Sequence, residues 1–310
     1  MAADSPAKNP ARWTVLALLN WTRGHLESAG ADSPRLAAEV LLAHALGCRR
    51  IELYTRYDFA PAEAQLARFR ELVTRAARRE PVAYLVGEKE FYSLPFLVTP
   101  DVLIPRPETE LLVEQAVGVL RGLDGPGAMW DVCTGSGCVA VATAKQVPGT
   151  AVLATDLSPA AVEVAKKNAA RHGLDGRVTV RQADLLTLPA DWPPQAQQPL
   201  QFGQPLPAAF DVITANPPYV PDKGEVAPEV AHEPAVALRG GPDGLDFLRR
   251  IIAGAPAFLR AAGALILEFG VDQGPAIRDL LAGTGAFREP KVFRDHHEIE
   301  RAVVAVRGTS

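Results

Sequence analysis

The chain has few of the features that mark a secreted, membrane-embedded or metal-binding protein. Its three cysteines, Cys48, Cys133 and Cys138, are too few for a disulfide framework, and no histidine flanks the last two at metal-ligand spacing. No uninterrupted apolar stretch approaches the roughly 20 residues that cross a bilayer. The opening sequence MAADSPAKNPARW has no apolar signal core. We therefore expect a cytoplasmic protein with no membrane partner and no structural metal.

A large excess of charge of either sign is also missing. The formal net charge is −4, which argues against a protein whose main function is to bind the phosphate backbone of a nucleic acid. With 310 residues, of which 48% are hydrophobic, the chain is long enough to form two domains with cores of their own. We expect a globular two-domain protein with no direct nucleic-acid substrate.

The first part of the chain has the periodicity of helices. Between residues 13 and 79 the apolar side chains recur at intervals of three and four, with no convincing strand. Ser33 followed by Pro34 is typical of a helix start, and Gly47 of its end. We expect residues 1–85 to form a small helical domain, which either stabilises the rest of the protein or recognises a partner.

A proline-rich segment follows the helical region. Residues 86–110 contain short aromatic and β-branched runs broken by prolines, which predicts a β-hairpin linker. The segment ends in the sequence IPRPETE, where the prolines stiffen the backbone and fix the positions of nearby side chains. We name as candidate substrate-channel residues Arg106, Pro107 and Glu108, together with Glu233 from a later loop.

Residues 111–310 alternate between apolar strands and amphipathic helices. This alternation predicts an α/β fold with a mostly parallel sheet covered by helices on both faces. The last two strands follow each other without a helix, so they are expected to be an antiparallel closing pair. Residues 188–208 are rich in proline, glutamine and alanine and are expected to be a surface insertion. The seven predicted strands are residues 129–132, 151–155, 178–182, 210–214, 264–269, 291–294 and 302–306.

A glycine-containing turn closes the first of these strands. In the sequence DVCTGSG, which ends at Gly137, glycines would let the backbone pass close under a bound nucleoside. The helix that follows would add exposed N–H donors. Gly135, Gly137 and Ala140 match the dinucleotide pattern GxGxxA, although that pattern alone is weak evidence.

Aspartates stand at the ends of three successive strands. Asp156 follows Gly137 by about 20 residues, the usual place for a carboxylate that binds both ribose hydroxyls. Asp184 ends the third strand, where its carboxylate or the Leu185 backbone would meet an adenine edge. With Asp131, these residues lie at the carboxyl edge where open α/β sheets bind ligands. NAD and S-adenosylmethionine both present adenosine to such an edge, so this half of the site fits either cofactor.

The sequence NPPY, Asn216 to Tyr219, ends the fourth strand and favours one of the two cofactors. An amide or aromatic amine nitrogen is a poor nucleophile because its lone pair is delocalised. The Asn216 oxygen can accept one N–H, the prolines offer carbonyls without a competing donor, and the Tyr219 ring can stack on a planar group. These groups suit a methyltransferase acting on nitrogen. NPPY alone does not separate a glutamine amide from an adenine amino group.

With these motifs the chain resembles the HemK/PrmC family of release factor glutamine methyltransferases. The likeness extends over nearly the whole chain, through the helical domain, GEKEFYSLPFLVTPDVLIPRPETE, DVCTGSG, NPPY and the tail at residues 265–301. It implies a Rossmann-like class I S-adenosylmethionine-dependent fold. It also implies methylation of the glutamine side-chain amide in the GGQ motif of class I peptide chain release factors, with the helical domain helping to grip that partner.

The resemblance also implies roles for individual residues. The family loop usually has glycine at the position of Cys133 and an aromatic residue at the position of Leu185. Transfer is expected to be direct, with Asn216 and the Pro217 carbonyl accepting the amide protons and Tyr219 packing on the amide plane. The expected catalytic residues are Asn216, Pro217, Pro218 and Tyr219. The expected cofactor-binding residues are Cys133, Thr134, Gly135, Ser136, Gly137, Asp156, Asp184, Leu185 and Asn216.

Three other functions compete with this one. A ribosomal-protein glutamine methyltransferase shares NPPY, but Arg106, Pro107 and Glu108 favour the release factor enzyme. A DNA adenine methyltransferase must also methylate a weakly nucleophilic NH2 nitrogen, but the chain lacks a basic domain that would recognise DNA. A non-catalytic adaptor with a vestigial cofactor site is opposed by the intact NPPY.

Overall fold

A computed structural model describes residues 12–188 and 209–309, which form two compact units. The first unit is Met1–Glu88 with Val226–His232, and the second is Lys89–Glu225 with Glu233–Ser310. The predicted insertion at residues 188–208 lies, apart from Leu188, outside the described residues. None of the described helices is both long enough and apolar enough to cross a membrane.

The first unit is helical, as its apolar periodicity predicts. Thr14 accepts the Ala17 N–H at the start of its first helix, and Gly47 ends the second with φ of 66°. Ser33 occupies the predicted N-cap position but forms no capping hydrogen bond through its side chain. The elements are α1 (Val15–Ser28), α2 (Pro34–Leu46), the 3-10 helix η1 (Arg50–Thr55), α3 (Glu63–Ala77) and α4 (Val82–Val86).

The segment Val226–His232 belongs to this first unit although it follows NPPY in sequence. Arg79 Nη2 donates to Glu229 Oε2 at 2.7 Å, and Arg79 also donates to the Ala29 carbonyl at 3.4 Å. One side chain therefore joins this late segment to the end of α1. The segment ends in the 3-10 helix η3 (Val230–His232).

A two-stranded hairpin and a helix precede the main sheet. The strands β1 (Glu88–Phe91) and β2 (Leu94–Leu97) are joined by Tyr92 and Ser93, which both have positive φ. Two such residues are the mark of a type I′ turn, which matches the twist of a hairpin. Phe91 and Phe96 are buried in the core of the second unit. After the short 3-10 helix η2 (Pro107–Thr109), α5 extends over Glu110–Arg121.

The main sheet has seven strands in the order β5-β4-β3-β6-β7-β9-β8. The first five are parallel, and β9 is antiparallel to both of its neighbours, which confirms the predicted fold class. Because β3 is flanked by β4 and β6, the strand order reverses at β3, the place where such sheets bind ligands. The strands are β3 (Ala128–Val132), β4 (Ala151–Asp156), β5 (Val178–Gln182), β6 (Phe210–Ala215), β7 (Leu259–Glu268), β8 (Lys291–Arg294) and β9 (Glu300–Val306).

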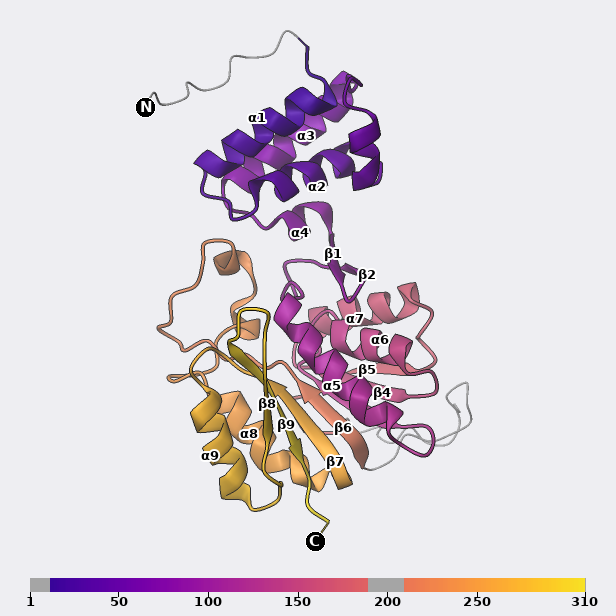
Figure 1. The fold of residues 1–310 in the computed structure, drawn as a ribbon, viewed down its shortest axis with the longest axis vertical. Coiled ribbons are helices and arrows are strands. Elements are labelled where there is room, and N and C mark those ends of the chain that lie inside the picture. Colours follow the sequence, from indigo (N-terminus) through magenta and orange to yellow (C-terminus); the bar gives the residue numbers. More distant parts are fainter. Residues whose placement is uncertain (1–11, 189–208, 310) are drawn as a thin grey trace. The chain divides into compact units, whose positions relative to one another are not determined.

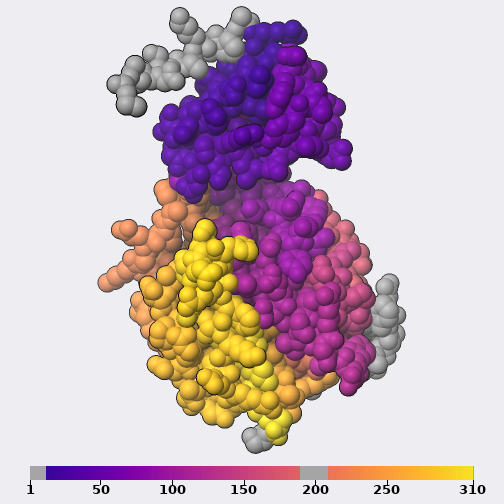
Figure 2. Space-filling model, in the orientation of Figure 1, coloured from indigo at the N-terminus to yellow at the C-terminus, as the bar shows by residue number. Residues whose placement is uncertain are grey.

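Helices cover both faces of this sheet (Figure 1). Alternate residues of β3 enter different cores, with Met129 packed on the side of α5 and Trp130 on the side of α8. Parallel strands buried on both faces need such continuous apolar runs. Figure 2 shows the surface of α5, in magenta, directly beside that of the C-terminal strands, in yellow. The helices are α6 (Cys138–Gln146) and α7 (Pro159–Arg171) with α5 on one face, and α8 (Asp246–Gly254) and α9 (Gly274–Thr284) on the other.

Candidate active site

A pocket opens where β3, β4, β5 and β6 end. The empty space in it, with its open mouth and the adjoining solvent counted, is about 970 Å³. The predicted residues that line it are Arg106, Cys133, Thr134, Gly135, Ser136, Asp156, Asp184, Leu185, Asn216 and Pro218. Pocket residues that were not among the predicted site residues include Asp101, Val102, Leu103, Pro105, Thr109, Val236, Ala237 and Phe247. The predicted residues outside the described lining are Gly137, Pro107, Glu108, Pro217, Tyr219 and Glu233.

Asp131 fastens the glycine turn to the neighbouring strand. Its carboxylate accepts the Thr134 hydroxyl at 2.5 Å and the Thr214 hydroxyl at 2.6 Å. Burial raises the pKa of Asp131 to about 6 in spite of these two hydrogen bonds. Since β3 and β6 are adjacent, the two bonds hold the ends of both strands together at the floor of the pocket.

The two glycines of the turn serve different steric needs. Gly137 has φ of 79°, and a Cβ there would lie 3.1 Å from the Ala165 Cβ of α7. Gly135 has φ of 54° and open space at its Cβ position on the pocket wall. Gly137 therefore permits close helix packing, and Gly135 leaves room in the pocket. This geometry accounts for the two glycines of the GxGxxA match.

Cys133 and Leu185 both have positive φ, 57° and 47°. At these two positions the resemblance leads us to expect glycine and an aromatic residue instead. A left-handed backbone is costly for any residue with a Cβ, which explains why glycine suits the position of Cys133. Both residues line the pocket, so their backbone groups lie beside it.

Asp156 holds the glycine turn in place and also lines the pocket with its carboxylate. Its Oδ2 accepts the Gly135 N–H and its Oδ1 accepts the Ser158 N–H, both at 2.9 Å. Burial raises the pKa of this carboxyl, and these backbone hydrogen bonds oppose the rise. Each carboxylate oxygen can accept more than one hydrogen bond, so both keep capacity for ligand hydroxyls. Asp184, by contrast, is half-exposed and pairs with Arg250 at 2.8 Å.

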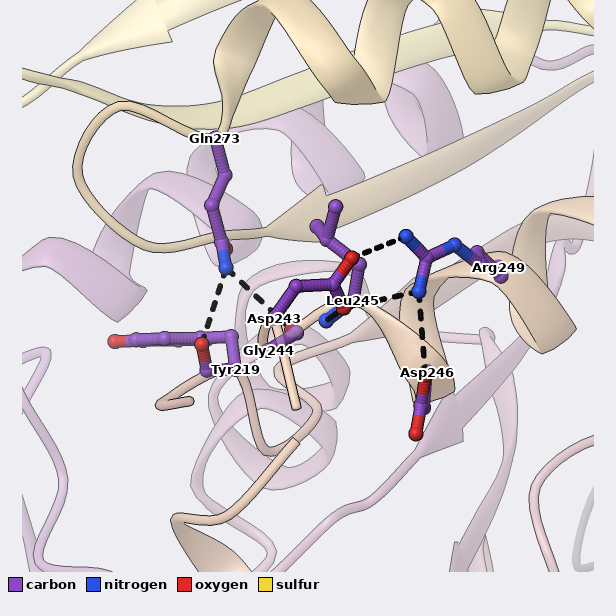
Figure 3. Close-up of polar contacts among 7 residues, drawn as sticks. All are labelled: Tyr219, Asp243, Gly244, Leu245, Asp246, Arg249 and Gln273. Atoms are coloured by element: carbon purple, nitrogen blue, oxygen red, sulfur yellow. Dashed lines mark hydrogen bonds and ion pairs between the residues drawn. The ribbon is translucent and has the colours of Figure 1, made fainter. Parts of the chain in front are cut away.

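The NPPY turn is held by hydrogen bonds from three directions. Asn216 Nδ2 donates to Thr109 Oγ1 at 3.1 Å, and the Tyr219 hydroxyl donates to Glu268 Oε1 at 3.1 Å. Gln273 Nε2 donates to the carbonyls of Tyr219 at 3.1 Å and Gly244 at 3.4 Å (Figure 3). The turn therefore has little freedom to move.

The loop before α8 fits tightly against the NPPY backbone. A Cβ on Gly240 would lie 2.5 Å from the Pro218 carbonyl oxygen. Arg249 Nη1 binds Asp243 at 2.9 Å and Asp246 at 3.2 Å, which ties this loop to α8 (Figure 3). The sequence GGPDG at residues 240–244 predicts a turn, but nothing in it or around Gln273 indicates a contact with NPPY, and both contacts were missed.

We predict that Gly244→Ala disrupts the site. Gly244 has φ of 78°, and a Cβ there would lie 2.2 Å from the Tyr219 carbonyl oxygen, so backbone must shift. The matched control is Gly173→Ala, with φ of 66° and nothing within 4 Å of the added Cβ. The control is expected to lose about 1 kcal/mol of unfolding free energy in a urea titration. Gly244→Ala is expected to lose roughly 2 kcal/mol more than the control, and to lose most of its methyltransferase activity as well. Equal losses in the two variants would contradict this fit.

Glu233 holds the IPRPETE segment in place. Its Oε2 accepts the Ile104 N–H at 3.0 Å, and its Oε1 forms an ion pair with Arg106 Nη2. The Glu233 side chain is only 1% exposed, whereas that of Arg106 is 27% exposed. The predicted channel residues Arg106 and Glu233 are therefore partners, and Glu233 sets the direction of the arginine on the pocket wall.

We predict that Glu233→Ala costs about 2–4 kcal/mol of unfolding free energy, because it leaves a partly buried arginine and a buried N–H unpaired. The control is Glu163→Ala, which removes a pair with Lys166 whose side chains are 61% and 48% exposed. That variant is expected to change stability by less than about 0.5 kcal/mol. Urea titration of both measures the difference, and a cost for Glu233→Ala as small as the control's would refute the structural role.

Comparisons with known proteins agree with this architecture. The PrmC N-terminal domain family matches residues 17–87, and a methyltransferase domain family matches residues 130–197. The release factor glutamine methyltransferase of Geobacter sulfurreducens is 41% identical over 299 residues, which are 96% of this chain and 98% of the relative. That of Moorella thermoacetica is 42% identical over 286 residues, or 91% and 94% of the two chains.

A solved structure supports the fold alone. The catalytic domain of hMettl16 in complex with the MAT2A 3'UTR hairpin 6 is 17% identical, with a TM-score of 0.54, and covers 76% of this chain and 81% of that one. The assignment to a family rests on the sequence relatives, which match nearly the full length of the chain. With an N-terminal family match, a methyltransferase domain and relatives above 40% identity, the chain belongs to the release factor glutamine methyltransferases.

Proposed function

We propose that this protein transfers a methyl group from S-adenosylmethionine to the side-chain amide nitrogen of the glutamine in the GGQ motif of class I peptide chain release factors. The observation that carries the proposal is the position of Asn216. It lies on the wall of the pocket at the strand ends, held by Thr109, while Asp156 stands at the end of another strand of the same pocket.

The residues of the pocket fit S-adenosylmethionine. A carboxylate at the end of β4 suits ribose hydroxyls, and Gly135, which has open space at its Cβ position, lets the backbone lie close to a ligand. Leu157, Leu185 and Phe247 provide apolar wall for an adenine. When bound, the cofactor supplies an electrophilic methyl group. We propose that it is held by Cys133 to Gly137, Asp156, Asp184, Leu185 and Asn216.

The NPPY residues would hold the substrate amide. Thr109 occupies the Nδ2 end of Asn216, which leaves Oδ1 to accept one glutamine N–H. The Pro217 carbonyl would accept the other, and the Tyr219 ring would pack on the amide plane. With both hydrogens directed at fixed acceptors, the nitrogen lone pair is aligned for attack, and alignment of this kind contributes on the order of 7–11 kcal/mol in oriented reactions. The amide loses a proton readily once alkylated, so no general base is needed before attack.

The remaining parts of the chain have proposed roles in protein recognition. We propose that residues 1–85 form a domain that grips the release factor, that residues 86–110 are a hairpin linker, and that residues 111–310 are the catalytic domain. Arg106, Pro107, Glu108 and Glu233 would line or support the channel for the glutamine. A release factor substrate would place the protein in the cytoplasm.

A substrate panel tests this proposal. The protein is incubated with methyl-labelled S-adenosylmethionine and a release factor, the same factor with its GGQ glutamine replaced by alanine, ribosomal proteins, or DNA. We expect label only on the intact release factor. Label on the alanine variant would overturn the assigned glutamine, and a preference for ribosomal proteins or DNA would overturn the substrate class.

A further inference from the structure

Tyr219 is held at both of its ends by the turn that follows β7. Its hydroxyl donates to Glu268 Oε1 at 3.1 Å. Its backbone carbonyl accepts a hydrogen bond from Gln273 Nε2, also at 3.1 Å (Figure 3). Glu268 is the last residue of β7, and Gln273 is the N-cap residue of α9. One short stretch of chain, 49 to 54 positions away in sequence, therefore contacts both the phenol end and the backbone end of Tyr219.

The hydrogen bonds of Gln273 fix which end of its amide faces Tyr219. Its Oε1 accepts the Gly270 N–H at 2.8 Å, while its Nε2 donates to the carbonyls of Tyr219 at 3.1 Å and Gly244 at 3.4 Å. If the amide were flipped, its NH2 group would face the Gly270 N–H and its oxygen would face two carbonyls. One side chain therefore joins the end of β7, the NPPY turn and the loop before α8 in a single arrangement.

Two glycines bring the backbone directly against this side chain. A Cβ on Gly270 would lie 3.1 Å from Gln273 Oε1 and 3.2 Å from Tyr219 Cδ2, on the edge of the ring. A Cβ on Gly244 would lie 2.8 Å from Gln273 Nε2. Since packing is this close, a shift of Gln273 must also move the ring or its neighbours.

Glu268 supplies a buried acceptor at the far end of the ring. It has no solvent exposure, and its Oε2 has no hydrogen-bond partner among residues 12–188 and 209–309. Its neighbours in sequence, Leu267 and Phe269, belong to the apolar core. A carboxyl group in such a place is costly, so its presence calls for a functional reason. The contact that it makes with the Tyr219 hydroxyl provides one.

We propose that Gln273 and Glu268 are positioning residues for methyl transfer, which act through Tyr219 and hold its ring in one place beside the substrate amide. Neither residue belongs to the described lining of the pocket, so neither is expected to contact the cofactor. The inference rests on the proposed function only in giving the Tyr219 ring the glutamine amide as its contact. It assigns the turn after β7 a role in the reaction.

Gln273→Met tests the contact at the backbone end. Methionine is unbranched like glutamine but cannot donate to the Tyr219 carbonyl. We expect kcat to fall about 10- to 100-fold, while the affinity for S-adenosylhomocysteine stays within about 3-fold of the parent. The matched control is Gln146→Met, which removes an exposed contact with Arg121 and should leave both quantities within about 2-fold. A kcat for Gln273→Met as high as the control's, or a cofactor affinity that falls as far as kcat, would overturn the positioning role.

A double-mutant cycle tests the contact at the phenol end. Tyr219→Phe keeps the ring but removes the hydroxyl, and Glu268→Met removes the acceptor. If the carboxyl acts only through this hydroxyl, each substitution should lower kcat by about 10-fold, and the two together by little more than either alone. Glu268→Gln, whose Oε1 can still accept the phenolic proton, should retain kcat within about 3-fold. Losses that multiply in the double variant would overturn the role of Glu268, and so would equal losses in Glu268→Gln and Glu268→Met.

An NMR readout of the ring itself needs no substrate. The chain has five tyrosines, and with carbon-13 at every tyrosine Cζ the signal of Tyr219 is identified by its absence in Tyr219→Phe. Gln273 donates to the backbone of Tyr219, so a shifted or broadened Cζ signal in Gln273→Met, with none in Gln146→Met, would show that the ring itself has moved. We expect this result, and a Cζ signal identical to the parent's would overturn the positioning role. If the parent methylates no release factor glutamine, the proposed function fails, whereas this signal still decides whether Gln273 fixes the ring.

Discussion

Replacing Asn216 with alanine is expected to lower kcat by about 10²- to 10³-fold, the usual cost of removing one fixed hydrogen-bonding group aimed at the reacting centre. The amide oxygen of Asn216 is the proposed acceptor, and the hydrogen bond from Asn216 Nδ2 to Thr109 holds this side chain in place. Alanine removes it without altering the carboxylate of Asp156 on the cofactor side. Rapid-quench measurement of methyl transfer at saturating substrates gives kcat for both proteins.

Two controls separate chemistry from folding in the Asn216→Ala variant. Its affinity for S-adenosylhomocysteine, measured by calorimetry, should stay within about 3-fold of the parent, because most proposed cofactor contacts lie on other strands. Its urea midpoint should also stay close to the parental value. A variant that methylates the release factor at the parental rate would show that Asn216 does not hold the amide.

Replacing Asp156 with asparagine is expected to weaken cofactor binding by roughly 100-fold or more. Two hydrogen bonds from ribose hydroxyls to a charged acceptor contribute about 1.5–3 kcal/mol each, of which the neutral amide keeps only part. The new NH2 group would also face the Gly135 or Ser158 N–H, donor against donor. Calorimetric titration with S-adenosylhomocysteine measures the loss.

Asp184→Asn is the matched control for this substitution. The Asp184 side chain is 47% exposed and pairs with Arg250, so the same chemical change there should weaken cofactor binding by less than about 10-fold. The kcat of Asp156→Asn at saturating cofactor should remain near the parental value, since its proposed contacts are to the cofactor alone. Equal affinity losses in the two variants would argue against a special role for Asp156.

The fold was predictable because its signals are local and repeated. Six strands of the main sheet lie within two residues of the predicted ones, since strands buried on both faces are continuous apolar runs, and β7 begins five residues before its predicted start. The glycines and aspartates at the strand ends indicated the pocket because they too are local signals, each adjacent in sequence to the strand that it follows. The antiparallel closing pair followed from the short connection between β8 and β9, which leaves no room for a crossover helix.

The support behind NPPY was not predictable, because it depends on contacts between distant parts of the chain. Thr109 meets Asn216 across 107 positions, and Gln273 meets Tyr219 across 54. A single threonine or glutamine has no pattern that distinguishes such a partner from a surface residue. Glu233 had been placed in the channel by its loop, but its burial against Arg106 and Ile104 is visible only in three dimensions.

Mapping the methylated residue tests the central proposal most directly. The protein is incubated with isotopically labelled S-adenosylmethionine and a purified release factor, and the product is digested and sequenced by tandem mass spectrometry. The proposed function predicts one labelled methyl group, on the side-chain amide of the GGQ glutamine. A label on any other residue, or on the release factor backbone, would contradict it.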